Sequence, residues 1–485
     1  MKGDRMKRFI FVFIFAFLFV FTSVLSTQDV FIQAKFPLKK VKAQGFDIYQ
    51  GILAWTPVSE DVNIGFARNH SSGTDEYSLV SLTFSDKGKC QSPILAAVDK
   101  GYPYVADLVW FNGESQTQEL QNAYGGLVFA LFSNALYQPG EEVTLAVAQF
   151  EENGILTSSW TDLITVKAPS PLDFVYDKTL GVSIGDDCVG LSLSVVFYNN
   201  ISIFRSFSYF LRTDFQGNLV DKPVRLKLFS NGARQSVKVF RPAWNGARWL
   251  VPLANTHIND PYFYMQSSQV YVYASKDEKA RKFKSRRIAQ DKEDHETYDC
   301  LNLIPINPAS LQADPSIQAK GNDYLLFVQH MGDYSTGPGP ANLIPDYHLY
   351  TINAHGRASG KPVEVLIPNQ GFSNSRHNYV SNIIPSHLLF QGAEGEQSEE
   401  DFLSAAQIVT ISPGPALQRL NFYKIYPSDG SVATLAKKEI HWRSKQIMPP
   451  SMRWNGKSIL VLNQGEKYTQ DRTASDFISS FKIMF

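Results

Sequence analysis

The stretch Phe240–Ser275 reads FRPAWNGARWLVPLANTHINDPYFYMQSSQVYVYAS, and it decides the fold. A short strand ends at Trp244, an Asn-Gly turn follows it, and a second strand is expected over Arg248–Ala254. Asn-Gly tolerates positive φ at both central positions of a tight hairpin. After a polar loop, alternating valine and tyrosine residues predict a third strand over Gln269–Ser275. The stretch is therefore a unit of antiparallel strands joined by hairpins.

The same unit returns along the chain, most clearly as MRWNGKSILVL at Met452–Leu462. The candidates for its second strand are Gly51–Pro57, Gly126–Ser133, Val189–Tyr198, Arg248–Ala254, Tyr324–His330, His387–Gln391 and Ser458–Gln464. The candidates for its third strand are Tyr77–Ser85, Val143–Phe150, Ser206–Asp214, Gln269–Ser275, Tyr347–Asn353, Leu420–Tyr426 and Phe477–Phe485. The two sets alternate strictly, at a spacing of about 65 residues, which suits four-stranded units with long loops.

Turns after the third strands support this reading. Glycine closes most of them, where a hairpin needs positive φ, at Gly88, Gly154, Gly217, Gly356 and Gly430. The fourth unit departs from the pattern and has Lys276-Asp277-Glu278 instead. Apolar-alternating outer strands are expected after the turns, for example over Leu219–Leu228 and Lys361–Ile367.

The seventh unit has no outer strand of its own, whereas Asp29–Val41 looks like an outer strand without predecessors. Pairing of Phe31–Phe36 with Phe477–Phe485 would close a ring and leave no long strand edge exposed. We therefore predict an all-β fold: a seven-bladed β-propeller over residues 27–485, closed by its N- and C-terminal strands. Tandem β-sandwich domains are the alternative fold.

With its Trp-Asn-Gly turns before the second strands at Trp244 and Trp454, the chain resembles exported bacterial β-propellers. The resemblance covers nearly the whole chain after the N-terminal segment but concerns architecture only. The sequence has no Trp-Asp dipeptides of the WD40 kind, no paired glycines of the kelch kind and no Asp box of the sialidase kind. No functional residue is therefore carried over from a particular family.

The N-terminus predicts export. Basic residues precede an unbroken apolar run over Phe9–Val20, and Val24-Leu25-Ser26 suits a cleavage site. We interpret residues 1–26 as a signal peptide; an uncleaved membrane anchor is the alternative, because roughly 17 apolar residues reach the lower limit of a bilayer span. Either way the bulk of the chain is expected outside the cytoplasm, as a secreted, periplasmic or cell-surface protein.

Composition limits the partners and the redox chemistry. Lys plus Arg and Asp plus Glu number 46 each, so no basic excess exists to attract nucleic acid or a membrane surface. Cys90, Cys188 and Cys300 are too few for a disulfide-built scaffold and too far apart for a zinc knuckle. One disulfide with one free thiol and three buried thiols both remain open.

Loops between second and third strands gather on one face of a propeller, which makes that face the expected site. Two of these loops hold a His-x-x-Asp pair: His257 with Asp260, and His330 with Asp333. A carboxylate that orients an imidazole favours a general base, and two such loops side by side suit one metal ion. The same spacing also arises where a histidine ends a strand and an aspartate begins a turn.

Further polar and ionisable residues occupy the predicted loops of this face. They include Arg68, Asn69 and His70 in the first unit, and Glu466, Lys467 and Asp471 in the seventh. No nucleophile elbow and no glycine-rich phosphate loop is present.

The sequence favours a binding scaffold for an extracellular or envelope protein or glycan, acting as a monomer without cofactor. A hydrolase or lyase acting on an extracellular polymer at the mouth of the central channel is the alternative. The sequence does not decide whether the protein is an enzyme or whether it binds a metal ion. The membrane enters this interpretation only through an uncleaved N-terminal segment.

Overall fold

The computed structural model describes residues 31–37, 46–59, 62–70, 76–85, 94–97, 100–112, 124–134, 138–199, 204–227, 235–244, 246–259, 264–277, 279–290, 297–305, 324–332, 344–368, 379–385, 403–410, 417–426, 428–441, 445–447, 451–454, 458–468 and 473–484. The regular secondary structure of these segments is entirely β. Within them, no helix is both long and apolar enough to span a bilayer.

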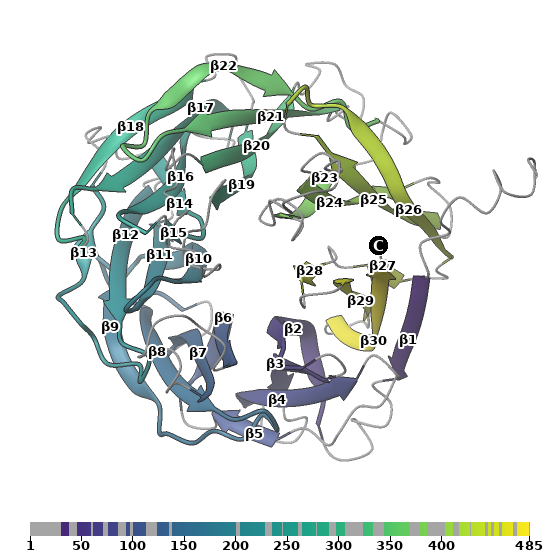
Figure 1. Ribbon diagram of the computed structural model, residues 1–485. Helices are drawn as coiled ribbons and strands as arrows, with labels where there is room; N and C mark the ends of the chain where they lie inside the picture. The colour runs from purple at the N-terminus through teal and green to yellow at the C-terminus, as the bar shows by residue number, and fades with distance from the viewer. Residues whose placement is uncertain are drawn as a thin grey trace, which may run out of the picture.

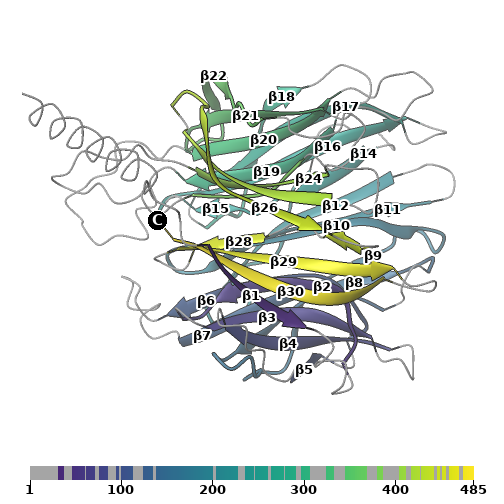
Figure 2. The ribbon, with the colours of Figure 1, turned by 90° about the vertical axis from the view of Figure 1, so that its right-hand side faces the viewer.

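Antiparallel sheets follow one another around a ring in chain order, which Figure 1 shows face-on. In most sheets the earliest strand lies nearest the centre and the latest lies at the rim. Figure 2 shows the ring from its side, with strands running between its two faces. This is the architecture of a β-propeller, as the sequence predicted.

Four sheets have four strands each. They are β6 (Tyr102–Asn112), β7 (Tyr124–Ser133), β8 (Glu142–Phe150) and β9 (Thr161–Lys167); β10 (Phe174–Ile184), β11 (Val189–Tyr198), β12 (Phe204–Thr213) and β13 (Val224–Arg225); β19 (Thr297–Pro305), β20 (Tyr324–Gly332), β21 (Ile344–Ile352) and β22 (Ala358–Glu364); β23 (Tyr379–Pro385), β24 (Leu403–Thr410), β25 (Leu417–Ile425) and β26 (Val432–His441). A fifth sheet consists of β14 (Gln235–Val239), β15 (Ala243–Trp244), β16 (Trp249–Asn259), β17 (Tyr264–Ser275) and β18 (Phe283–Gln290).

The remaining strands form one nine-stranded sheet. They are β1 (Phe31–Pro37), β2 (Ile48–Pro57), β3 (Val62–His70), β4 (Tyr77–Ser85) and β5 (Ile94–Ala97), with β27 (Lys445–Ile447), β28 (Ser451–Trp454), β29 (Ser458–Tyr468) and β30 (Thr473–Met484). Its two halves, β2–β5 and the strands around β29 and β30, are joined by one residue pair, Tyr49 with Ala474.

The predicted pairing of the first strand with the last is present. β1 runs antiparallel to β30, from Phe31 opposite Ile483 to Pro37 opposite Phe477. Residues far apart in sequence thus share one sheet, which covers an edge of β30 that would otherwise be open.

Most strand predictions agree with the structure, but the first unit was shifted by one strand. Gly51–Pro57 lies in β2, the first strand of its sheet. The second strand is β3, where the sequence predicted a loop. The polar residues at the end of β3 explain this error. His387–Gln391, the second strand predicted for the sixth unit, lies outside the described residues. The second strand of that sheet in the structure is β24, which pairs with β23.

The turn after β17, which belongs to the fifth sheet and to the fourth unit of the sequence, also departs from the glycine pattern. Gly154, Gly217, Gly356 and Gly430 have φ between 72° and 88° in the corresponding turns of four other sheets. In the fifth sheet Ala280 takes the positive φ, 49°, and its amide donates to the Asp277 carbonyl at 3.1 Å. The turn is therefore kept without glycine, although an L-residue is strained there.

The core lies between sheets, and Trp249 illustrates how closely they pack. Trp249 is 1% exposed, and its ring lies over Gly190 on β11 of the preceding sheet. A Cβ atom added at Gly190 would come within 2.5 Å of the six-membered part of the indole. Phe210 lies against the same indole, with ring centroids 5.5 Å apart. Glycine at position 190 is therefore required by the tryptophan that follows the Asn-Gly turn.

We expect Gly190→Ala to destabilise the protein by about 1–3 kcal/mol, the usual cost of overpacking. Phenylalanine at position 249 lacks the second ring that the new methyl group would meet. The double variant Gly190→Ala/Trp249→Phe should therefore be more stable than the sum of the two single changes indicates, as a denaturant-unfolding cycle would measure. Strict additivity in that cycle would contradict this contact.

Candidate functional site

The histidines predicted as site residues lie in strands rather than in loops. His257 belongs to β16, with Ser267 opposite it on β17, and His330 belongs to β20, with Asp346 opposite it on β21. Asp260 and Asp333 lie outside the described residues. Convergence of the four side chains therefore stays a prediction. Among the residues that the structure does describe, no group of three His, Cys, Asp or Glu side chains has the arrangement of a metal site.

The first-unit residues Arg68 and His70 were predicted to lie in a loop, and this prediction is wrong. Both lie on β3 and are buried, at 3% and 5% exposure. The Arg68 guanidinium donates to the carbonyls of Pro103 and Tyr104, at 2.7 and 2.8 Å, and lies over the Tyr102 ring. It therefore joins two sheets, a role that the sequence did not reveal.

A buried glutamate lies beside this junction. Glu141 is fully buried, and one of its carboxylate oxygens accepts hydrogen bonds from the Tyr104 and Ser133 hydroxyls. Burial raises the pKa of Glu141, against the opposing effect of these hydrogen bonds and of Lys178. Burial likewise lowers the pKa of Lys178, whose ammonium group lies 4.2 Å from the centre of the Tyr104 ring. The cluster therefore places two titratable groups in the contact between neighbouring sheets.

Stability should depend on pH through Glu141. Its folded-state pKa is raised above the ordinary value of 4.5, so its contribution is complete below that pH and is lost as pH rises through the raised value. Glu141→Gln removes the ionisation while keeping an oxygen acceptor for both hydroxyls. We expect melting temperatures measured from about pH 4 to about pH 8 to fall less in the variant than in the wild type. Parallel curves would contradict this assignment.

An aromatic patch lies on the neighbouring sheet β10–β13, at the same face of the ring as Glu141. The loops between second and third strands were expected at this face. Tyr176 is 44% exposed, and it lies at a bulge in β10: Val175 pairs with Phe197 and Asp177 with Val196, which leaves Tyr176 without an opposite residue. Bulges commonly redirect a side chain in this way. The Tyr176 ring meets the Phe204 ring edge-on, with centroids 5.0 Å apart. The predicted face therefore carries an exposed ring on an innermost strand.

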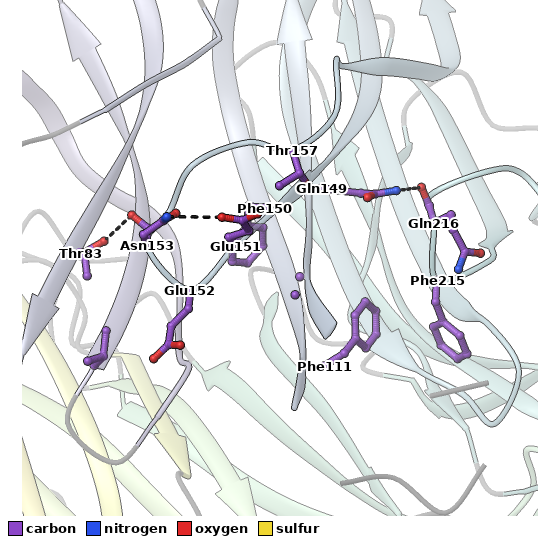
Figure 3. Close-up of a pocket in the computed structure, with 13 residues that line it drawn as sticks. Thr83, Phe111, Gln149, Phe150, Glu151, Glu152, Asn153, Thr157, Phe215 and Gln216 are labelled. Atoms are coloured by element: carbon purple, nitrogen blue, oxygen red, sulfur yellow. Dashed lines mark hydrogen bonds between the residues drawn. The ribbon is translucent and has the colours of Figure 1, made fainter. Parts of the chain in front are cut away.

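A groove lies on the opposite face, between three sheets (Figure 3). Its volume is about 700 Å³. Its lining residues are Val62, Thr83, Phe111, Gly125, Gly126, Gln149, Phe150, Glu151, Glu152, Asn153, Thr157, Phe215 and Gln216. They come from the ends of β3, β4, β6, β7 and β8, from the β8–β9 turn and from the turn after β12. Local sequence patterns did not reveal this groove, because its parts belong to three separate hairpins.

Hydrogen bonds between sheets hold the walls of the groove. The Thr83 hydroxyl donates to the Asn153 carbonyl at 3.0 Å, and the Gln149 side-chain amide donates to the Gln216 carbonyl at 2.9 Å (Figure 3). Within the β8–β9 turn, the Gly154 amide donates to the Glu151 carbonyl at 2.8 Å. The turn is thus fixed on both sides, and the groove is formed in advance of any ligand.

The floor and the rim of the groove differ in chemistry. Phe111 and Phe215 meet edge-on with centroids 5.2 Å apart, and both are largely buried. Gly125 and Gly126 lie beside them, and a Cβ atom at Gly126 would come within 2.3 Å of the Phe150 ring. The rim consists of amides, hydroxyls and the exposed carboxylates of Glu151 and Glu152, with no lysine or arginine among the lining residues. The groove therefore suits a polar ligand that is neutral or positively charged.

Comparison with known proteins gives only architectural similarity. No protein-family model matches the chain, and no curated protein matches it. Three solved structures similar to it are the β-propeller domain of the Trilobed protease from Pyrococcus furiosus (11% identity, TM-score 0.35, 90% of this chain and 93% of that chain), the polysaccharide lyase Uly1 (10%, 0.45, 94% and 98%) and the Pyrococcus horikoshii acylaminoacyl peptidase (10%, 0.36, 87% and 52%). At these values the similarities assign no activity to this chain.

Proposed function

We propose that this protein is an exported β-propeller that serves as a binding scaffold, and that its ligand is a glycan held in the groove between β3–β4, β6–β8 and the turn after β12. The observation that carries the proposal is the preformed groove of about 700 Å³, with an aromatic floor and a rim of hydrogen-bonding side chains. Sites for small ligands commonly combine an apolar surface with a few placed polar groups.

A sugar fits this chemistry better than an apolar ligand does. Its hydroxyl groups need many partners, and the groove offers Gln149, Glu152, Thr157 and Gln216 around its rim. The Phe111 and Phe215 side chains provide an apolar surface for its C–H groups. The two carboxylates favour a neutral or amino sugar over an acidic one, since like charges repel.

The proposal also includes the number of blades and their closure. Seven blades result if the nine-stranded sheet is divided at the single Tyr49–Ala474 pair, because β2–β5 and the β27–β30 group then count separately. The β1–β30 pairing supports closure by strands from both ends of the chain. The basic and apolar N-terminal pattern supports export.

We expect Glu152→Gln and Gln216→Ala each to weaken glycan binding by about tenfold, which corresponds to about 1.4 kcal/mol. Each change removes or alters a hydrogen-bonding group at the rim and leaves the buried rings in place. Binding would be screened on a glycan array with the full chain and then measured by titration calorimetry with the glycan that the array identifies.

Glu364→Gln is the matched control, because Glu364 is an exposed carboxylate on β22, in a different sheet. It should bind like the wild type. An array without a bound glycan, or glycan binding that the rim variants leave unchanged, would overturn the groove as the site. In the second case the exposed face around Tyr176 becomes the next surface to test.

A further inference from the structure

The innermost strands bring two arginines to one buried carboxylate. Asp107 lies within β6 and is 6% exposed. The Arg241 guanidinium donates through Nη2 to both of its carboxylate oxygens, at 2.8 and 2.6 Å. Arg453 on β28 approaches from another sheet, with its Nη2 3.7 Å from Oδ1, and donates through Nε to the Trp55 carbonyl on β2. Figure 1 shows β2, β6 and β28 on the inner side of the ring.

Main-chain amides complete the surroundings of Asp107. The Leu108 amide donates to Oδ1 at 2.9 Å, and the Val182 amide on β10 donates to Oδ2 at 3.0 Å. Each carboxylate oxygen therefore already accepts at least two hydrogen bonds. The carboxylate has little capacity left for further donors from either arginine.

Charge in this cluster does not balance. Two guanidinium groups share one carboxylate, which leaves one positive charge in excess. Among the described residues, no second carboxylate lies within ion-pair distance of either arginine. Burial lowers the pKa of Arg453 to about 10, Arg241 adds to this effect, and Asp107 opposes it. The excess positive charge therefore disfavours the charged form of Arg453, the more buried of the two arginines.

Some donors of the two arginines also have no partner among the described residues. The contacts of Arg241 within the described residues use only Nη2, and those of Arg453 use only Nε and Nη2. The Arg241 side chain is 44% exposed and the Arg453 side chain 23%, so solutes reach them. At Gly181 on β10, a Cβ atom would come within 2.4 Å of the Arg241 Cα, so the arginine backbone is held directly against the neighbouring sheet. The base of the Arg241 side chain is therefore fixed, and the two hydrogen bonds from Nη2 to Asp107 orient its guanidinium group.

We propose that Arg241 and Arg453 form an oxyanion-binding site on the inner side of the ring. Its ligand is a carboxylate or phosphate, either as a free small anion or as the acidic group of a larger molecule. A guanidinium presents parallel N–H donors that match the two oxygens of such a group. Asp107 acts as a positioning residue, because it fixes Arg241 with the remaining N–H groups available. This site is separate from the acidic groove and takes a ligand of opposite charge.

Thermal stability of the full chain measures binding, because a ligand that binds only the folded state raises the melting temperature. We expect inorganic phosphate to raise it more than sodium chloride of equal ionic strength. Arg241→Gln should weaken the apparent phosphate affinity by at least about tenfold. Arg281→Gln is the matched control, since Arg281 is an exposed arginine that also donates to an aspartate, Asp221 at 3.1 Å; it should respond like the wild type.

A second measurement on the wild type keeps the test valid if Arg241→Gln does not fold. Phenylglyoxal modifies accessible arginines, and peptide mass spectrometry would quantify modification at Arg241 and Arg281. Phosphate should protect Arg241 and leave Arg281 unprotected. A short polyglutamate peptide in place of phosphate separates the two sources: protection by both indicates a site open to a larger ligand, and protection by phosphate alone indicates a small free anion. Equal shifts with chloride, or no protection of Arg241 by either anion, would overturn the site.

Discussion

Burial of both faces of each sheet is the constraint on which this structure depends. Between neighbouring sheets, apolar side chains of β6–β9 and β10–β12 form one continuous cluster that includes Leu127, Phe129, Leu191 and Phe197. A sheet in this position cannot alternate simply between apolar and polar residues, because it has no face toward water. The strands are consequently apolar on both faces, as in the segment 127–132 of β7, and polar residues within such strands need partners on the next sheet.

That constraint accounts for the polar residues inside the ring. Arg68 donates to carbonyls of the next sheet. Asp107 accepts from the Val182 amide on β10 and from Arg241, and it forms a longer ion pair with Arg453 at 3.7 Å. Each of these contacts joins two sheets of the ring. The same residues can also bind a ligand. Around Asp107 the arginine N–H donors outnumber the carboxylate acceptors, so this contact between sheets offers donors to an anion. The groove differs, because it lies at the hairpin ends, where backbone turns and carboxylates face solvent.

The sequence was informative about strands and turns because both depend on local chemistry. Alternation and β-branched residues located β11, and glycine with positive φ located the turns at Gly217 and Gly356. β3 was missed because Arg68, Asn69 and His70 were interpreted as solvent-exposed, whereas their partners lie on other segments. Asp107 did offer a signal, a lone carboxylate within the apolar strand YPYVADLVWFN, but its arginine partners are 134 and 346 positions away. Local sequence patterns could not predict the groove for the same reason, because three hairpins that are distant in sequence form it.

The pairing of β1 with β30 has a consequence for biosynthesis. The strand at Phe31–Pro37 precedes every other described strand, whereas its partner at Thr473–Met484 follows them all and is therefore synthesised much later. Sheets such as β6–β9 are built from neighbouring hairpins and can form while the chain is still emerging, because local contacts cost little loop entropy. The edge of β1 that pairs with β30 stays open until β30 has been synthesised. An open strand edge can pair with other chains. Delivery of the chain in an unfolded state, followed by folding once β30 has arrived, would shorten the time for which that edge is exposed.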